Sequence, residues 1–243
     1  MISFILPVYD CSKDFCKGFL RFRQYLDNQA YFFEFIVVDD GSNHWKDLQS
    51  FVVTQGGTFL RNAKNRGKGY SIKRGIEVAR GDIVIFMDGD FPFDFVSVTC
   101  LVEQISKSTY DIVIGDRQHK ESFYPTEVPW IRRFGSAICS FIVGNFLVPN
   151  LYDTQCGIKG FKLTQAKFLF NQLTVERYSF DVEILYLAKH AGYSIGRIPV
   201  IVKSYGTTRV NVIKDGLRMM AAIVKIACNS ILGKYDFNGK RMD

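Results

Sequence analysis

Short apolar runs alternate with helical patterns through the first half of the chain. The pattern predicts strands over 2–8, 33–38, 58–60, 83–87 and 112–114, and helices over 15–28, 71–79 and 96–106. Gly81 follows the second of these helices in the position of a C-cap glycine. Continuous apolar strands separated by helices are typical of a parallel sheet that is covered on both faces. The sequence therefore predicts an α/β fold with a Rossmann-like, mostly parallel central sheet.

The second half has a less regular pattern. It contains an apolar stretch over 134–152, a helix over 180–190, a strand over 194–202 and a final helix over 212–232. Gly144 and Pro149 interrupt the apolar stretch, so it falls short of the ~20 apolar residues that span a bilayer. We expect a buried or interfacial helix there, followed by a loop. No linker or repeat divides the chain, so 1–243 is predicted to be one domain.

The chain is basic, with 31 Lys and Arg against 24 Asp and Glu and a net charge of +7. This balance favours anionic partners such as nucleotide diphosphates, lipid phosphates or an anionic membrane. No RNA-binding signature is present, so a nucleic-acid partner is not expected. The six cysteines form no CxxC pair and the three histidines are scattered, which argues against a zinc site and a Ser-His-Asp triad. Reduced thiols are typical of a cytosolic protein, and no cleavable signal is predicted.

Two carboxylates, Asp88 and Asp90, follow the apolar run over 83–87 with only Gly89 between them. In a parallel sheet, ligands bind beyond the carboxyl ends of the strands. Carboxylates in this arrangement can hold one Mg²⁺ or Mn²⁺ ion, whose other ligands are substrate phosphates and water. Such an ion neutralises the charge that develops on a departing diphosphate. The alternative is a polar turn after a buried strand.

Asp39 and Asp40 follow the second predicted strand in the same way and could accept hydrogen bonds from a nucleotide base or ribose. The alternative is a turn in which Asp and Ser side chains cap the next helix. The loop over 65–69 carries Arg66 and Lys68 before a predicted helix, so its amides and cations suit a phosphate or a base edge. A solvated basic turn is the alternative.

Four motifs follow one another along the first half: ILPVY at 5–9, VVDDGS at 37–42, NRGKG at 65–69 and FMDGD at 86–90. The set resembles the family 2 inverting glycosyltransferases, which have the GT-A fold. The resemblance implies that 1–116 bind a nucleotide-sugar donor. The residues implied for the donor are Pro7, Tyr9, Asp39, Asp40, Lys68, Asp88, Gly89 and Asp90. Asp88 and Asp90 would also hold the metal.

Two motifs in the second half, DTQCGIK at 153–159 and VERYSFDVE at 175–183, resemble the dolichyl-phosphate β-glucosyltransferases. The dolichyl-phosphate mannose synthases share this layout more loosely and carry a glutamine where this chain has Pro92. The resemblance implies that 117–210 bind a polyprenyl (dolichyl-type) phosphate. It favours a UDP-sugar donor, with glucose as the sugar, and leaves UDP-N-acetylglucosamine and GDP-mannose open. The residues implied for the acceptor phosphate are Arg117, Arg132 and Ser136, and those implied for a loop that closes over the donor are Tyr205, Gly206 and Arg209.

Three further acids lie in the second-half motifs. Asp153 precedes a glycine-containing turn and could reach the metal or the reacting centre. Asp181 and Glu183 lie two residues apart on a predicted helix, or about 200° around its axis, so at most one of them points into the site. We favour Asp181 as a residue that supports the site or begins the helix, with Glu183 as the alternative.

The expected reaction is a single in-line displacement with inversion at the anomeric carbon. A phosphate monoester is already an anion near neutral pH, so Arg117 and Arg132 would only need to orient it and neutralise its charge. The expected catalytic residues are Asp88, Asp90, Arg117 and Asp153.

The alternative acceptor is a sugar hydroxyl in capsule, lipopolysaccharide or another glycan. It would need a general base, for which Asp153 is the first candidate and Asp181 the second. A nucleotide-sugar-binding protein without turnover is the alternative of another class.

The last predicted segment, 211–243, contains a helix with an apolar stripe and positive charges. The stripe comprises Val212, Ile213, Leu217, Met220, Ile223, Val224, Ala227 and Ile231, and the charges come from Lys214, Arg218, Lys225 and Lys234. The helix could lie on an anionic membrane surface, or pack on the core or in a dimer. We expect a cytoplasmic protein, peripheral on the cytoplasmic face of a membrane. The sequence leaves open whether the chain forms a homo-oligomer.

Overall fold

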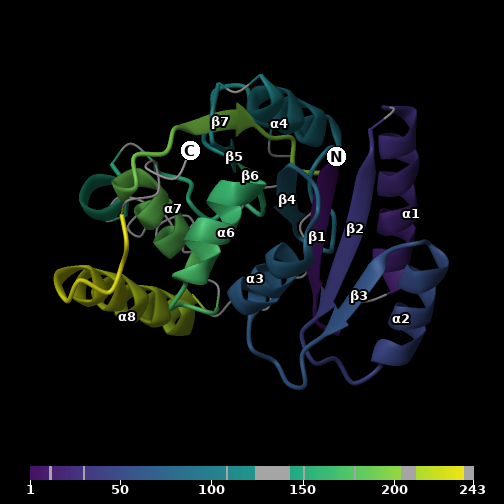
Figure 1. Ribbon diagram of the computed structural model, residues 1–243, viewed down its shortest axis with the longest axis horizontal. Helices are drawn as coiled ribbons and strands as arrows, with labels where there is room; N and C mark the ends of the chain where they lie inside the picture. Colours follow the sequence, from purple (N-terminus) through teal and green to yellow (C-terminus); the bar gives the residue numbers. More distant parts are fainter. Residues whose placement is uncertain are drawn as a thin grey trace.

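The centre of the molecule is one seven-stranded sheet with the strand order β3-β2-β1-β4-β6-β5-β7 (Figure 1). The computed structural model describes residues 1–10, 13–29, 31–107, 109–123, 143–149, 151–177, 179–203 and 212–237. The strands are β1 (Ile2–Val8), β2 (Phe33–Asp39), β3 (Thr58–Arg61), β4 (Ile83–Met87), β5 (Ile112–Asp116), β6 (Ile158–Lys162) and β7 (Ile195–Pro199). β1 to β4 are parallel to one another, and β7 is parallel to β5. The prediction of an α/β fold with a mostly parallel sheet is confirmed.

Helices cover both faces of this sheet (Figure 1). They are α1 (Lys13–Asn28), α2 (Trp45–Thr54), α3 (Lys68–Val78), α4 (Val96–Ser106), α6 (Leu163–Asn171), α7 (Phe180–His190) and α8 (Val212–Ile231), with a π-helical turn, η1 (Val143–Leu147). α1, α2 and α4 share a core with Phe4 and Leu6, whereas α3, α6, α7 and α8 share one with Ile5. Alternate residues of β1 therefore enter different cores, which is why the predicted strands are apolar along their whole length.

β6 runs antiparallel between β4 and β5, and the sequence analysis did not predict it. Lys159 and Gly160 interrupt the apolar run that marks the other strands. A Cβ at Gly160 would lie 2.1 Å from Leu101 Cδ2, so the glycine lets α4 lie close to the sheet. The helices α2 and α6 were also not predicted.

Two local predictions are wrong. Gly81 is not a left-handed C-cap, because α3 ends at Val78 and the φ angle of Gly81 is not positive. Its role is a close approach: a Cβ there would lie 2.7 Å from the backbone nitrogen of Ser3 in β1. The last strand, β7, is shorter than expected, because among the described residues just after it Ile201 and Val202 form only isolated bridges, with Phe123 and Phe93.

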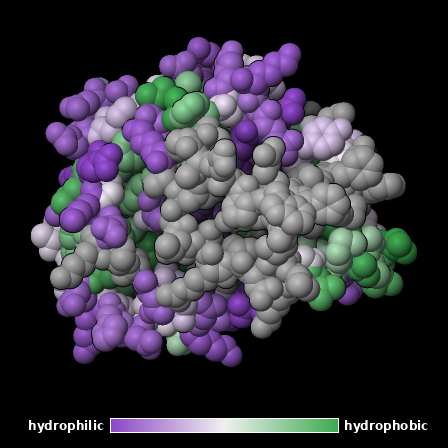
Figure 2. Space-filling view, turned by 180° about the vertical axis from the view of Figure 1, so that it is seen from behind, coloured by the Kyte–Doolittle hydropathy of each residue, from purple (hydrophilic) through white to green (hydrophobic). Residues whose placement is uncertain are grey.

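The apolar stretch over 134–152 is described only at its end, where Val143 and Leu147 of η1 are buried. α8 packs one face on the core. The buried residues of that face are Met219, Ala222, Ile223 and Ile226, whereas the exposed apolar residues of the helix include Leu217, Met220, Val224 and Ile231. Most described residues of the predicted apolar stripe therefore lie on the solvent-exposed face of α8, at the right edge of the molecule in Figure 2, and Ile223 is buried. Within the described part of the chain, no helix is long and apolar enough to cross a membrane.

Replacing Gly81 with alanine should destabilise the protein by about 1–3 kcal/mol, the usual cost of overpacking. The added methyl group would meet the β1 backbone, which cannot shift without disturbing the sheet. Gly216→Ala is the matched control, because nothing lies within 4 Å of its Cβ position. Since alanine favours helix, this control should be neutral or up to about 1 kcal/mol stabilising. Urea unfolding measures both variants, and equal midpoints would contradict the close approach.

Candidate functional site

The carboxyl ends of β1, β2 and β4 lie next to one another, because these strands are adjacent and parallel. Pro7 lies within β1 and Tyr9 follows it, Asp39 ends β2 and Asp40 follows it, and Asp88 follows β4. In Figure 1, β1 runs downward from the N-terminus toward this edge, and β2 and β4 are parallel to it. Ligands of open α/β sheets bind at such an edge, so it is the candidate site.

Asp40 shapes the loop over 65–69. Its Oδ1 accepts hydrogen bonds from Asn62 Nδ2 at 2.7 Å and from the Arg66 N–H at 2.8 Å. Its Oδ2 accepts one from the Gly67 N–H at 2.7 Å. Because this buried carboxylate already has three donors, it fixes the path of the loop. Contact between Asp40 and a nucleotide stays a prediction.

Asp39 fixes the turn after β2. Its buried carboxylate accepts a hydrogen bond from the Ser42 N–H at 3.2 Å and lies 3.4 Å from Arg61 Nε. The Arg61 guanidinium in turn lies 4.8 Å from the centre of the Trp45 ring. These contacts connect the end of β2 with the start of α2. Asp39 therefore holds the turn between these two elements in place.

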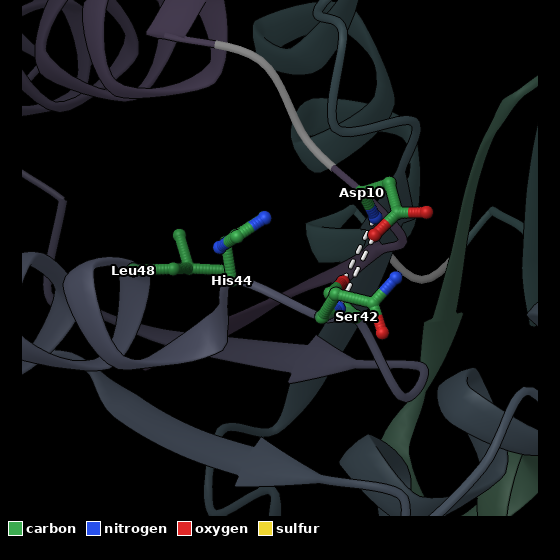
Figure 3. Close-up of a pocket in the computed structure, with 5 residues that line it drawn as sticks. Asp10, Ser42, His44 and Leu48 are labelled. Carbon is green, nitrogen blue, oxygen red and sulfur yellow. Dashed lines mark hydrogen bonds between the residues drawn. The ribbon is translucent and has the colours of Figure 1, made fainter.

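A pocket of about 270 Å³ opens between the turns that follow β1 and β2 (Figure 3). The Asp10 N–H donates to Ser42 Oγ at 2.8 Å, and the Asn43 N–H donates to Asp10 Oδ1 at 3.3 Å. Asp10 has a φ of 44°, a left-handed conformation that no motif in the sequence predicts. The lining residues are Asp10, Ser42, Asn43, His44 and Leu48. Asp10 and His44 were missed by the sequence analysis, although Asp10 directly follows the first motif.

The loop over 65–69 packs directly against the segment that begins at Val175. A Cβ at Gly67 would lie 2.7 Å from the Glu176 carbonyl oxygen, and one at Gly69 would lie 2.6 Å from Phe180 Cβ. Arg66 forms an ion pair with Glu176 at 2.6 Å. Two motifs more than a hundred positions apart in the sequence are therefore one structural unit. Only glycine permits this approach.

Lys68 and the acids after β4 form the charged centre of the site. Lys68 Nζ lies 2.5 Å from Asp88 Oδ1. A Cβ at Gly157 would lie 1.9 Å from Asp88 Oδ2, so this glycine makes room for the carboxylate. The pKa of Asp90 is raised, first by desolvation and then by the negative charge of Asp88. Negative charge is therefore only partly compensated at this turn.

A buried ion pair lies behind this centre. Lys159 Nζ, on β6, lies 2.6 Å from Asp181 Oδ1, on α7, and donates to the Cys156 carbonyl oxygen at 2.6 Å. Burial raises the pKa of Asp181, and the charges of Lys159 and Lys68 only partly oppose this. Burial would lower the pKa of Lys68, but Asp88 and Asp181 hold it above its ordinary value. Charges thus alternate from Lys159 through Asp181 and Lys68 to Asp88.

Lys159 was missed by the sequence analysis as a supporting residue. The signal was a single lysine inside the apolar run of what proved to be β6. Phe86 lies below both lysines, with its ring centre 5.5 Å from Lys159 Nζ and 5.8 Å from Lys68 Nζ. The two cations are therefore held between carboxylates and an aromatic face.

Glu183 points to another part of the molecule, as the helical spacing predicts. It is fully buried, accepts hydrogen bonds from the Val175 N–H and the Tyr235 hydroxyl at 2.7 Å each, and accepts one from Thr174 Oγ1 at 2.5 Å. Burial, followed by the bond to Glu183, raises the pKa of Tyr235 to about 12. Glu183 thus joins α7 to the segment after α8, while Asp181 faces the site.

Arg117 and Asp153 form one unit. Arg117 donates to the buried Asp153 carboxylate through its backbone N–H at 2.7 Å, through Nε at 2.9 Å and through an Nη at 2.6 Å. This two-pronged arrangement is the strong form of an arginine–carboxylate pair. The sequence analysis gave the two residues separate roles, and the structure brings them together. Arg132, Ser136, Tyr205, Gly206 and Arg209 lie outside the described residues.

The donor set at the edge fits a divalent cation with few protein ligands. Within the described residues, no group of three or more His, Cys, Asp or Glu side chains could hold a metal by itself. Asp88 and Asp90 supply two carboxylates on one turn, and burial, followed by the negative charge of Asp88, raises the pKa of Asp90. Mg²⁺ and Mn²⁺ sites of this kind use one or two carboxylates and take their other ligands from substrate phosphates and water.

Residues 3–163 match the family described as Glycosyl transferase family 2. This chain belongs to that family. It is 33% identical over 219 residues to human dolichyl-phosphate β-glucosyltransferase, covering 82% of this chain and 66% of the relative. It is 32% identical over 210 residues to the protein of the same name from Dictyostelium discoideum, covering 83% of this chain and 64% of the relative. The chain thus spans just under two thirds of the length of these relatives.

Solved structures share the fold of this family 2 glycosyltransferase. The UDP complex of glucosyl-3-phosphoglycerate synthase from Mycobacterium tuberculosis superposes with a TM-score of 0.67 at 17% identity, covering 93% of this chain and 79% of that one. Mannosyl-3-phosphoglycerate synthase from Rubrobacter xylanophilus has a TM-score of 0.61 at 12% identity, covering 96% of this chain and 74% of that one. The predicted GT-A fold is confirmed.

Replacing Lys159 with methionine should destabilise the protein by about 3 kcal/mol, because it leaves the buried Asp181 carboxylate without its partner. The double variant Lys159→Met with Asp181→Leu removes both charges and should regain most of that loss. Thermal and urea unfolding measure the cycle. If the single variant unfolds at the wild-type midpoint, the pair does not support the site as described.

Proposed function

We propose that this family 2 glycosyltransferase moves a hexose, with glucose favoured, from a UDP-sugar to a polyprenyl phosphate with inversion. The proposal depends above all on the segment over 153–157. Asp153 at its start holds Arg117, and Gly157 at its end contacts Asp88. An anion-binding arginine and the charged turn after β4 are thereby held together by five consecutive residues. The dolichyl-phosphate β-glucosyltransferases cited above support the choice of acceptor and sugar.

The donor's place is the edge formed by β1, β2 and β4. The pocket beside Asp10 and Ser42 suits part of a nucleoside, and Tyr9, half exposed beside it, offers an aromatic face. Asp39 and Asp40 keep the walls of this region in place. Lys68 supplies positive charge for the diphosphate. In this proposal 1–116 bind the donor and 117–210 the acceptor.

Asp88 and Asp90 would hold Mg²⁺ or Mn²⁺, and the ion would neutralise charge on the departing diphosphate. A solved neighbour of the same fold contains Mn²⁺ and UDP, which supports this assignment. Lys68 neutralises Asp88 in the protein itself. With a metal ion on Asp88, the Lys68 ammonium group would be available to the diphosphate, so this lysine would neutralise Asp88 in the protein alone and the diphosphate in the complex.

The acceptor's place is beside Arg117. A phosphate oxygen attacks the anomeric carbon as the bond to the diphosphate oxygen breaks, so the sugar is transferred with inversion. The attacking phosphate is already an anion near neutral pH and needs no general base. Asp153 already accepts hydrogen bonds from three Arg117 donors, so we assign it to positioning Arg117 rather than to taking a proton. Burial raises the pKa of Cys156 to about 12, which excludes this thiol as a nucleophile near neutral pH.

A lipid acceptor places the reaction at a membrane surface, and we propose the cytoplasmic face. The described cysteines Cys16, Cys100, Cys156 and Cys228 are free thiols, which is the state expected in a reducing compartment. The protein's positive net charge suits both the donor and an anionic bilayer.

Arg117→Ala should lower kcat/KM for a short, soluble polyprenyl phosphate by about 100-fold, because two charge-assisted contacts to the phosphate are worth roughly 1.5 kcal/mol each. Release of UDP from UDP-glucose is measured with and without the lipid phosphate. Slow hydrolysis of the donor in the absence of acceptor should be unchanged. Arg80→Ala is the matched control, since Arg80 also donates through Nε and an Nη to a carboxylate, Glu34 Oε2, but at the other end of the strands.

If UDP release does not respond to the lipid phosphate, the acceptor is a sugar hydroxyl, and the pH profile should then show a general base. If no nucleotide sugar is turned over under any condition, the chain binds its donor without catalysis.

Asp88→Asn should lower turnover at least about 100-fold and abolish Mn²⁺ binding in the presence of UDP, because a neutral amide replaces one of two carboxylate ligands. Calorimetric titration with Mn²⁺ measures the binding. Asp82→Asn is the control, because Asp82 precedes the same strand at its other end. Full turnover by Asp88→Asn with a chelator present would rule out the metal.

A further inference from the structure

Two residues other than glycine have a positive φ in the described part of the chain, Asp10 and Phe91. They come just after β1 and β4, adjacent strands whose carboxyl ends form the candidate site. Aspartate adopts the left-handed conformation comparatively readily, but a bulky side chain does so rarely. Phe91 has a φ of 49° and directly follows Asp90. Residues in such rarely populated conformations cluster at functional sites, where the surrounding structure holds them.

The next residue makes this conformation less favourable still. Pro92 follows Phe91, and a proline restricts the residue before it to extended conformations with a negative φ. The local sequence therefore opposes the path that the chain takes at residue 91. Contacts with other parts of the molecule must hold it there.

The first of these contacts is made by the side chain of Phe91, which is 8% exposed and packs on α1. Its ring centre lies 5.8 Å from those of Phe15 and Phe22 and 6.4 Å from that of Phe95. A Cβ at Gly18 would lie 2.4 Å from Phe91 Cδ2, so this glycine lets the ring lie against the backbone of α1. The ring is thereby fixed in position.

The chain after Phe91 is held from another direction. The Asp94 N–H donates to the Ile201 carbonyl oxygen at 2.8 Å, and the Lys203 N–H donates to the Pro92 carbonyl oxygen at 2.7 Å. Lys203 Nζ also lies 2.7 Å from Asp94 Oδ2. The backbone on the carboxyl side of Phe91 therefore cannot move without breaking these contacts.

Asp90 lies between two fixed ends. β4 fixes the chain before Asp88, and the Phe91 N–H donates to the Asp88 carbonyl oxygen at 3.1 Å, which closes a turn over 88–91. The carboxylates of Asp88 and Asp90 repel each other, so a loose turn would let them separate. A return of Phe91 to a negative φ would rotate the peptide group between residues 90 and 91. Since the chain beyond is held, the turn that carries Asp90 would have to absorb that rotation.

We propose that Phe91 is a positioning residue for the metal site: its buried ring holds residue 91 in the left-handed conformation and thereby keeps the Asp90 carboxylate beside that of Asp88. The inference rests on the proposed function in one respect, since the cation is what the two carboxylates are kept together to bind. Phe91 acts through Asp90 and need not touch the ion, UDP or the sugar. Its effect is therefore measured as the affinity for the cation.

The experiment is calorimetric titration of the full chain with Mn²⁺ in the presence of UDP. Phe91→Ala should lower the Mn²⁺ affinity at least about tenfold, because alanine lacks the ring and disfavours a positive φ. Phe91→Gly also lacks the ring, but glycine adopts a positive φ freely, so its affinity should stay within about threefold of the wild type. Better binding by the glycine variant is the result that a purely structural role would not give.

Phe19→Ala is the matched control. Phe19 is also on α1 and fully buried, and its ring centre lies 4.4 Å from that of Phe35. This variant should lower the urea midpoint about as much as Phe91→Ala does, because each loses one buried ring. Its Mn²⁺ affinity should equal that of the wild type. Circular dichroism establishes that each variant is folded at the temperature of the titration.

Gly18→Ala tests the same contact without changing the metal turn. The added methyl group would displace the Phe91 ring, so the Mn²⁺ affinity should fall at least about threefold. Alanine favours helix, so the variant keeps α1. Gly216→Ala, which adds a methyl group where nothing lies within 4 Å, should bind Mn²⁺ as the wild type does.

Equal Mn²⁺ affinities in Phe91→Ala and Phe19→Ala would overturn the proposal, as would a loss in Phe91→Gly as large as that in Phe91→Ala. If Phe91→Ala does not fold, the comparison of Gly18→Ala with Gly216→Ala decides in the same way. A wild-type protein that binds no Mn²⁺ with UDP would refute the metal assignment itself and this inference with it. That outcome is distinct from a failure of Phe91 alone, in which the wild type binds the ion and the variants bind it equally well.

Discussion

The buried ion pair between Lys159 and Asp181 is the interaction on which the arrangement of the site depends. It connects β6 to α7 directly behind the turn that carries Asp88. Two charges placed in a protein interior must satisfy one another, since neither has access to water. Lys68 interacts with both Asp181 and Asp88, and its Nζ lies 2.5 Å from Asp88 Oδ1. The charge order at the strand ends is therefore set by a contact made deep in the core.

Three glycines of the site also hold the two halves of the chain together, because each allows a close approach that a side chain would prevent. Gly157 makes room for Asp88, while Gly67 and Gly69 admit the backbone at Glu176 and the side chain of Phe180. Each of these contacts joins a motif of the first half to one of the second. The motifs of the two halves are therefore the two sides of single contacts, and a change on one side alters the other.

The strands and helices that a local sequence pattern encodes could be predicted from the sequence. β4 was predicted because its five residues are all apolar. Asp88 was predicted as a site residue because it directly follows this strand. The opposite directions of Asp181 and Glu183 follow from helix geometry alone. β6 was not predicted, because Lys159 and Gly160 hide the strand pattern and their partners are distant in sequence.

Pairings between distant residues could not be read from the chain in the same way. No spacing rule connects Arg117 to Asp153, since their contact depends on how β5 and the segment before β6 lie in the finished sheet. For the same reason Gly81 was given a local role as a helix cap, when it is the neighbouring strand β1 that requires a glycine there.

The position of β6 has a consequence for how the chain is made. β4 is complete at Met87, but the strand that pairs with its second edge begins only at Ile158. During synthesis the apolar edge of β4 therefore stays open while some seventy further residues leave the ribosome, and open edges pair readily with other chains. β6 closes this edge and joins β4 to β5 in one step. The two halves are thus not separable modules: a chain that stops before β6 holds an unfinished sheet, and its first half depends on its second to remain soluble.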